Sequence, residues 1–155
     1  MPASYVMPDK KSIRELLEMI FGKGVIVAKL PAVDTSDKIV ATFVNDDDQL
    51  VALCACDRNF ASYSGGALSL IPPDAINEVI DKGEMTEIMS ENFHEVMNIC
   101  SKLLMSDSSA HLRLDKTLSA AESADSISSL AAARASAYSI EIPRYGKGAV
   151  HFLVS

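Results

Sequence analysis

Segments with helical apolar spacing alternate with short strand-like runs along this chain of 155 residues, and no linker long enough to divide it into two domains interrupts them. The spacing predicts helices over residues 9–21, 57–70, 73–82, 84–105 and 123–135. Short apolar or alternating runs predict strands over residues 25–30, 38–44, 49–57, 110–118, 137–142 and 149–154. This order predicts a single domain of the α+β class over residues 1–155, with residues 1–8 as a loose lead and long helices packed on an antiparallel-rich sheet.

Turn residues and glycines sharpen three parts of this prediction. Residues 45–48, Asn-Asp-Asp-Asp, separate two strand-like runs and predict a hairpin turn. Gly65 and Gly66 lie inside a predicted helix, where the pair costs roughly 2 kcal/mol relative to alanine, so another backbone could approach closely there. Residues 143–148 contain Pro143, Gly146 and Gly148 and predict a turn before the final strand.

The composition indicates an ordinary core and excludes several classes of partner. Hydrophobic residues make up 48% of the chain, and 21 acidic against 14 basic side chains give a net charge of -7. This acidic balance, without a Lys/Arg cluster, argues against nucleic acid or an anionic membrane as a partner. The longest apolar run, Leu50 to Cys56, is far shorter than the ~20 residues of a membrane helix. The first residues also lack the apolar region of a secretory signal, so we expect a cytoplasmic protein.

The most informative segment is residues 84–105, EMTEIMSENFHEVMNICSKLLM. Helical spacing divides it into two faces. The apolar stripe is predicted to consist of Ile88, Phe93, Val96, Met97, Cys100, Leu103 and Leu104. The polar ridge is predicted to consist of Glu87, Glu91, Glu95, Asn98 and Lys102. The ridge therefore presents a carboxylate and a carboxamide about one turn apart, beside a cation.

Such a ridge has two interpretations, one purely structural and one chemical. A run of charges on a helix usually means a solvated face, and this interpretation is favoured roughly three to one on the residues alone. The chemical interpretation is that a carboxylate pairs with a lysine of a partner, while a carboxamide, which both donates and accepts hydrogen bonds, holds a water in line with an electrophile. Glutamine orients the attacking water in this way in some phosphate-cleaving enzymes.

The sequence Glu91-x-x-x-Glu95-x-x-Asn98 resembles the D/S-x-x-x-E-x-x-N signature of the CheC/CheX/FliY phosphatases of bacterial chemotaxis. The similarity extends over residues 57–105, where a small-residue segment, a helix and a Gly-acidic break lead into the motif helix. The resemblance implies a CheC-like fold, in which the two halves of the chain are a diverged internal duplication. It also implies that the protein dephosphorylates the phospho-aspartate of a CheY-like response regulator.

The resemblance assigns a role to individual residues. Glu95 matches the glutamate that pairs with the active-site lysine of the regulator, and Asn98 matches the asparagine that orients the attacking water. Glu91 and Lys102 belong to the partner-binding surface. The family usually has Asp or Ser at the position of Glu91 and commonly has Gly at the position of Lys102. The magnesium of the reaction belongs to the regulator, so the resemblance implies no metal or other cofactor of the chain's own.

The number of motifs leaves the activity open. The first predicted helix has Lys11, Glu15 and Glu18 at the motif spacing but no asparagine. A single motif is typical of CheX-like members, which are homodimers, so a homodimer is implied as well. The alternative to a phosphatase is a non-enzymatic CheC-like module that binds a phosphorylated response regulator.

Other candidate sites have better structural explanations. Cys54 and Cys56 share one face of a predicted strand, are too close in sequence for the usual zinc-ligand spacing, and are predicted to be buried. His94 lies next to Glu95 in sequence but about 100° around the helix, so it is predicted to be a partly exposed structural residue rather than a base. The acidic residues 46–48 could bind a cation weakly, but a polar hairpin turn is the better interpretation.

Overall fold

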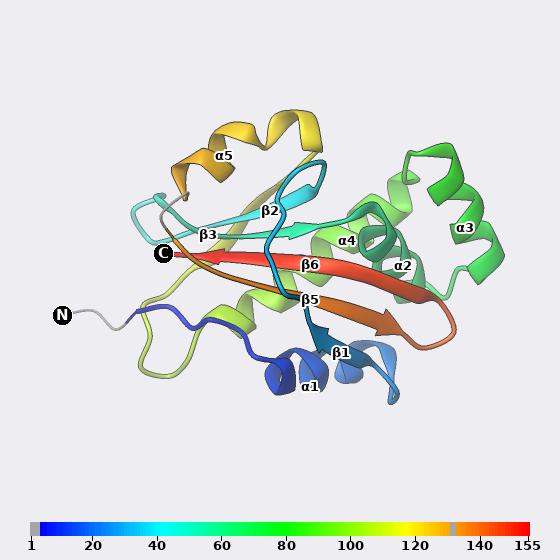
Figure 1. Cartoon of the computed structure of the whole chain (residues 1–155), viewed down its shortest axis with the longest axis horizontal. Helices are drawn as coiled ribbons and strands as arrows, with labels where there is room; N and C mark the ends of the chain where they lie inside the picture. The colour runs from blue at the N-terminus through cyan, green and yellow to red at the C-terminus, as the bar shows by residue number, and fades with distance from the viewer. Residues whose placement is uncertain (1–3, 131–132) are drawn as a thin grey trace.

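The computed structural model describes residues 4–130 and 133–155 of the chain. Five α-helices and six β-strands occupy this part of it (Figure 1). The helices are α1 (Lys10–Phe21), α2 (Arg58–Leu68), α3 (Pro73–Lys82), α4 (Glu87–Cys100) and α5 (Ala124–Ser129). The strands are β1 (Ile26–Lys29), β2 (Ile39–Val44), β3 (Leu50–Cys56), β4 (Arg113–Leu118), β5 (Arg134–Ile142) and β6 (Gly146–Val154). Among the described residues, no helix is long and apolar enough to span a membrane.

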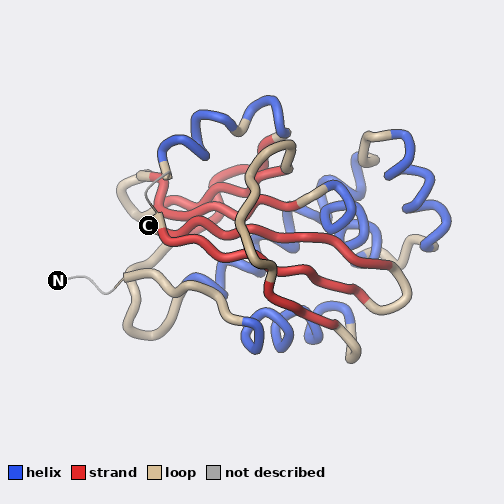
Figure 2. The backbone as a smooth tube through the Cα atoms, in the orientation of Figure 1, coloured by secondary structure: helices blue, strands red, loops and turns tan. Residues whose placement is uncertain are grey.

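The six strands form one sheet in the order β1-β5-β6-β3-β2-β4 (Figure 2). Every neighbouring pair is antiparallel. The hairpin predicted around residues 45–48 joins β2 to β3, and a second hairpin joins β5 to β6. The predicted α+β class with an antiparallel-rich sheet is therefore confirmed.

The sheet has the internal symmetry expected of a duplicated chain. Exchanging β1, β2 and β3 with β4, β5 and β6 turns the strand order into its own reverse, with β3 and β6 as the central pair. Each half begins with a helix, α1 before β1 and α4 before β4. The architecture thus supports the predicted diverged duplication and makes α1 the counterpart of α4.

The two faces of the sheet are covered differently. Helices α1, α2 and α4 pack on one face, over the main hydrophobic core. On the other face, α5 and the connection between β1 and β2 cover a smaller apolar cluster. Figure 1 shows this connection passing in front of the sheet. Val33 and Ile127 pack against that cluster, and the backbone N–H of Asp34 donates to His151 Nδ1 at 3.2 Å. The connection between β1 and β2 and the connection between β4 and β5 therefore lie on the same side of the sheet.

Glycines allow α2 to approach its neighbours closely. A Cβ atom at Gly65 would overlap the backbone carbonyl of Met89 in α4, and one at Gly66 would overlap the side chain of Ile76 in α3. Gly148 in β6 lies against Phe60 of α2 in the same manner. The close backbone approach anticipated at Gly65-Gly66 is confirmed, and it fixes α4 beside α2.

The structure corrects three sequence predictions of secondary structure. The helix predicted over residues 123–135 is only α5, Ala124–Ser129, while residues 131–132 lie outside the described part. Arg134 already pairs with Val154 of β6, and this pairing outweighs the helical propensity of alanine. Gly146 and Gly148 belong to β6 rather than to a turn, because small residues are needed where α2 crosses the strand. The helix predicted over 84–105 is α4 followed by a 3₁₀ helix at Ser101–Leu104.

The lead before α1 is attached to the domain rather than loose where it is described. The backbone N–H of Val6 donates to the carbonyl of Leu104 at 2.8 Å, and the Tyr138 hydroxyl donates to the carbonyl of Pro8 at 3.0 Å. Asp9 then caps α1, with its side chain accepting from the N–H of Ser12 at 2.7 Å. These contacts hold α1 against the core from its first residue.

Candidate functional site on helix α4

Helix α4 is fixed by its start, its buried face and its end. Thr86 caps its start, where the hydroxyl oxygen accepts from the N–H of Met89 at 3.2 Å. At its end the Ser101 hydroxyl donates to the carbonyl of Asn98 at 2.6 Å. Its core-facing side chains are Met89, Phe93, Val96, Met97 and Cys100. The opposite face is thereby turned to solvent.

The predicted ridge lies on this open face. Glu91, Glu95 and Asn98 are all exposed, and Lys102 is exposed in the 3₁₀ helix that follows. Within residues 4–130 and 133–155, no side-chain hydrogen bond or ion pair engages the carboxylates of Glu91 and Glu95 or the carboxamide of Asn98. Three and four residues along a helix place side chains on one side of it, so a partner could contact all of these groups at once.

The side of α4 facing α2 is held by a polar contact. The Asn92 amide donates to the carbonyl of Gly65 at 2.9 Å and to the Ser69 hydroxyl at 2.6 Å. These bonds add to the close approach of Gly65 to Met89. The ridge therefore stands on a helix whose position and rotation are both constrained, which is the condition for a preorganised site.

One residue of the predicted apolar stripe is in the wrong place. Ile88 is not buried but 57% exposed, and Met89 is buried instead. Met89 lies four residues before Phe93 and seven before Val96, so the helical spacing continues the stripe through Met89, and Ile88 lies about 100° away from it around the helix. Ile88 lies three residues before Glu91 and seven before Glu95, on the same side as the ridge.

The first helix does not repeat the site, although it is the counterpart of α4. The carboxylate of Glu18, which stands where Asn98 stands in α4, accepts from the backbone N–H of Gly24 at 2.8 Å. Glu15, at the position of Glu95, lies 3.9 Å from the ammonium of Lys11. The Glu18 side chain is thus engaged in the turn between α1 and β1.

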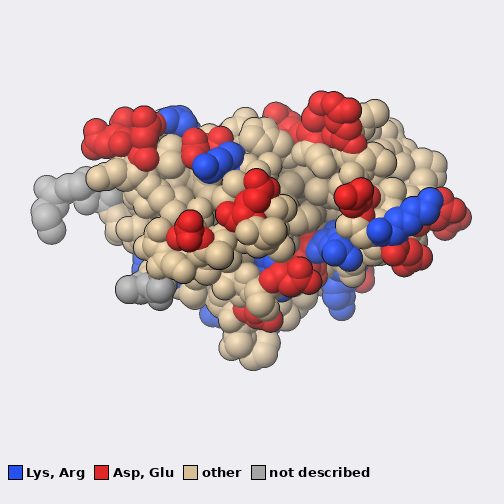
Figure 3. Space-filling view, turned by 90° about the horizontal axis from the view of Figure 1, so that it is seen from above, with Lys and Arg blue, Asp and Glu red and all other residues tan. Residues whose placement is uncertain are grey.

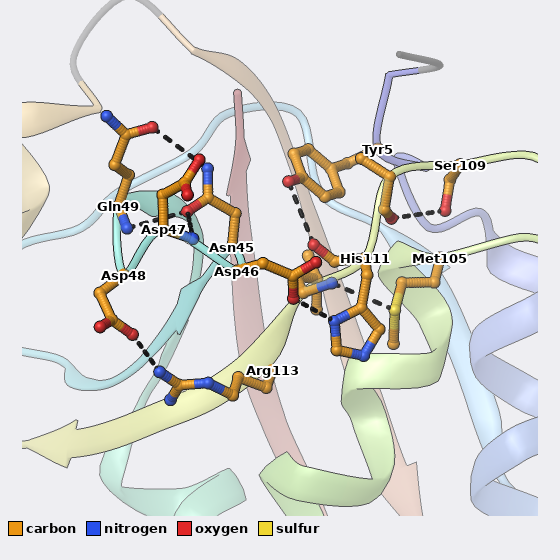
Figure 4. Close-up of polar contacts among 12 residues, drawn as sticks. Tyr5, Asn45, Asp46, Asp47, Asp48, Gln49, Met105, Ser109, His111 and Arg113 are labelled. Atoms are coloured by element: carbon orange, nitrogen blue, oxygen red, sulfur yellow. Dashed lines mark hydrogen bonds and ion pairs between the residues drawn. The ribbon is translucent and has the colours of Figure 1, made fainter.

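The acidic hairpin turn is occupied by contacts within the protein (Figure 4). Asn45 Oδ1 accepts from the N–H groups of Asp47 and Gln49 at 2.9 and 3.0 Å. Asp46 lies 3.0 Å from His111, and Asp48 pairs with Arg113. The polar-turn interpretation of residues 45–48 accounts for these side chains.

The cysteines and His94 do not add chemistry to the ridge. Cys54 and Cys56 are buried, as predicted, with their sulfur atoms 3.6 Å apart. Burial raises the pKa of the Cys56 and Cys100 thiols, so both stay protonated and unreactive near neutral pH. His94 is exposed, and within the described ranges no hydrogen bond or ion pair fixes its ring.

The charged groups and hollows of the surface leave the ridge as the better candidate. Figure 3 shows acidic side chains scattered over one face, where the basic ones of the described chain form no continuous patch. A hollow of about 860 Å³ lies at the start of α4, between residues that include Asp57, Arg58, Glu84 and Ser90. Glu91, Glu95 and Asn98 do not line it. The ridge therefore stands on the open surface of α4 rather than in this hollow.

Comparison with known proteins gives a match in structure only. No model of a protein family matches the chain, and no curated protein matches its sequence. The structure of the FliM–SpeE complex from H. pylori matches with a TM-score of 0.61 at 9% identity, covering 94% of this chain and 80% of that one. The FliM middle domain from H. pylori matches with a TM-score of 0.50 at 9% identity, covering 94% and 84%.

A third match is the CheX–CheY–BeF3–Mg complex from Borrelia burgdorferi, with a TM-score of 0.45, 10% identity and 90% coverage of each chain. CheX and the FliM middle domain share the CheC/CheX/FliY fold. The match with a TM-score of 0.61 therefore confirms the resemblance inferred from the motif at the level of the fold.

Proposed function

We propose that the chain is a phosphatase that hydrolyses the phospho-aspartate of a CheY-like response regulator, with Glu95 and Asn98 as its working pair. The observation that carries this proposal is their joint exposure on α4. No other described residue engages either side chain, so a partner protein can reach both. A ridge buried under another helix could not perform this reaction. The resemblance of the motif supplies the substrate class.

The chemistry required of the two side chains is limited. An acyl phosphate is already labile, so positioning and electrostatics are sufficient for catalysis. The Asn98 carboxamide, a donor and an acceptor at once, orients a water toward the phosphorus atom. The water oxygen forms a bond to phosphorus, the bond between phosphorus and the aspartate oxygen breaks, and inorganic phosphate and a free aspartate result. Glu95 forms an ion pair with the regulator's lysine and sets the register.

The metal of this reaction is the regulator's own magnesium, which neutralises charge on the phosphoryl group. Asn98 and Glu95 need only reach the partner's site, and the chain contributes no metal ligand to the proposed reaction. A homodimer, the state implied by the CheX-like resemblance, would carry two such ridges.

A non-enzymatic module that binds a phosphorylated regulator is the second candidate. Lys102 favours it, because this exposed lysine replaces a residue that is commonly glycine in the family and could crowd the docked regulator. The match with a TM-score of 0.61 is also to a structure containing FliM rather than CheX. Binding without hydrolysis is the property that separates the two candidates.

The decisive experiment follows the decay of phosphorylated CheY-like receivers with and without saturating protein. Faster decay that is lost in Asn98→Ala and Glu95→Ala supports the phosphatase. Glu15→Ala is the matched control, since it removes the corresponding glutamate from α1. Binding of a receiver with unchanged decay would leave the non-enzymatic module, and neither binding nor faster decay with any receiver would overturn both candidates.

A further inference from the structure

Ile88 is an apolar side chain on the proposed docking face that the fold itself does not explain. It is 57% exposed, while the adjacent Met89 is only 1% exposed and fills the core position. A β-branched residue has a slightly lower helix propensity than Glu or Lys, so neither packing nor propensity accounts for isoleucine here. Single exposed apolar side chains are common on protein surfaces, so the position of Ile88, on the same side of α4 as Glu95 and Asn98, is what points to a contact in an interface.

The surroundings of Ile88 are acidic. Glu87 and Glu91 in α4 and Glu84 just before it are exposed and lie within four residues of Ile88. Among the described residues, the other large exposed hydrophobic side chains are Met19, Ile26 and Leu70. Met19 belongs to α1, Ile26 to β1 and Leu70 to the turn after α2, so of these four Ile88 alone shares a helix with Glu95 and Asn98.

We propose that Ile88 is a partner-contact residue, and that it packs on an apolar patch of the CheY-like receiver whose phospho-aspartate reaches Asn98. This inference rests on the proposed function and extends it. Ten residues separate Ile88 from Asn98, which is about 15 Å along the helix at 1.5 Å per residue. A standard interface of roughly 800 Å² per partner covers both positions.

The charges around Ile88 define the complementary surface. An apolar contact enclosed by polar groups is the arrangement in which water is excluded from a central anchor. Glu87 and Glu91 would face cations on the receiver, beside the lysine that Glu95 is proposed to meet. The receiver is therefore expected to carry an apolar side chain bordered by Lys or Arg near its phosphorylation site, and salt is expected to weaken binding.

The test separates affinity from chemistry. The probe is a CheY-like receiver activated with beryllofluoride and Mg²⁺, and the readouts are its Kd for this protein and the saturating rate of receiver dephosphorylation. We expect Ile88→Ser to raise the Kd about 10-fold, as expected from losing one buried aliphatic side chain, and to change the saturating rate less than 2-fold. Ile88→Leu should restore the affinity. Met19→Ser removes an 84% exposed apolar side chain from α1 and is the matched control, expected to leave both readouts unchanged.

The outcomes distinguish this inference from the proposed function. If the wild-type protein binds a receiver and accelerates its decay, but Ile88→Ser binds equally well, the role of Ile88 is overturned and the phosphatase stands. An equal loss of affinity in Met19→Ser would also overturn it, because the effect would then be a general one of surface apolarity. If the wild-type protein neither binds nor dephosphorylates any receiver, both the function and the contact are overturned.

Discussion

Gly65 of α2 lies directly against the backbone carbonyl of Met89 in α4, with no room for a Cβ atom between them. The same glycine accepts, through its own carbonyl, a hydrogen bond from the Asn92 amide at 2.9 Å. One residue of α2 thus sets both the distance to α4 and the rotation of that helix. The orientation of the exposed ridge depends on this contact.

Gly65→Ala is therefore expected to destabilise the protein. Overpacking against a backbone atom costs about 1–3 kcal/mol, and the better helix propensity of alanine returns about 1 kcal/mol. Gly66→Ala is the matched variant, because it meets the Ile76 side chain, which can move more easily than a backbone carbonyl. Chemical denaturation should rank Gly65→Ala as the less stable of the two, and the reverse order would contradict the role given to Gly65.

Asn98→Asp tests the carboxamide with little change in shape. The substitution removes the amide donor and places a carboxylate next to the phosphoryl group, so the rate of dephosphorylation should fall by about 100-fold or more. Since Asn98 is exposed, the free energy of unfolding should change by less than about 0.5 kcal/mol. Single-turnover decay of the phosphorylated receiver and urea denaturation measure the two effects separately. A rate close to that of the wild type would remove Asn98 from the reaction.

The ridge was predictable because helical periodicity assigns most residues of α4 correctly to its buried or its exposed face. Ile88 was assigned to the stripe although Met89, four residues before Phe93 and seven before Val96, fits the helical spacing better. The alanine-rich stretch before β5 was predicted as helix because local propensity ignores pairing with β6. Gly146 and Gly148 were assigned to a turn because their contacts with α2 come from more than eighty residues away. Whether Glu95 and Asn98 have partners within the chain is likewise a property of the tertiary structure.

Glu18 offers a test of how the first half of the duplication has diverged. Its carboxylate accepts from the N–H of Gly24, so Glu18→Ala should lower the free energy of unfolding by about 0.5–1.5 kcal/mol. The rate of receiver dephosphorylation should stay within 2-fold of the wild type, since the ridge of α1 is not proposed to act. Glu15→Ala, which removes the exposed neighbour, should change stability less. A loss of phosphatase activity in Glu18→Ala would mean that α1 contributes to the site.

His151 should make the protein less stable in mild acid. Its Nδ1 accepts from the N–H of Asp34, and it must be unprotonated there to do so. Burial, together with the charge of Lys38, lowers the pKa of His151 below its ordinary value, although Asp34 and Asp57 oppose the shift. The unfolded chain therefore binds more protons than the folded one between the two pKa values. The free energy of unfolding should decrease as pH falls through about 6.5, by at most about 1.4 kcal/mol per pH unit for one proton, and level off below the folded-state pKa.

Urea denaturation between pH 8 and pH 5 measures this slope. His151→Gln should flatten it, whereas His94→Gln on the exposed face of α4 should not. An unchanged slope in His151→Gln would assign the pH dependence to other groups.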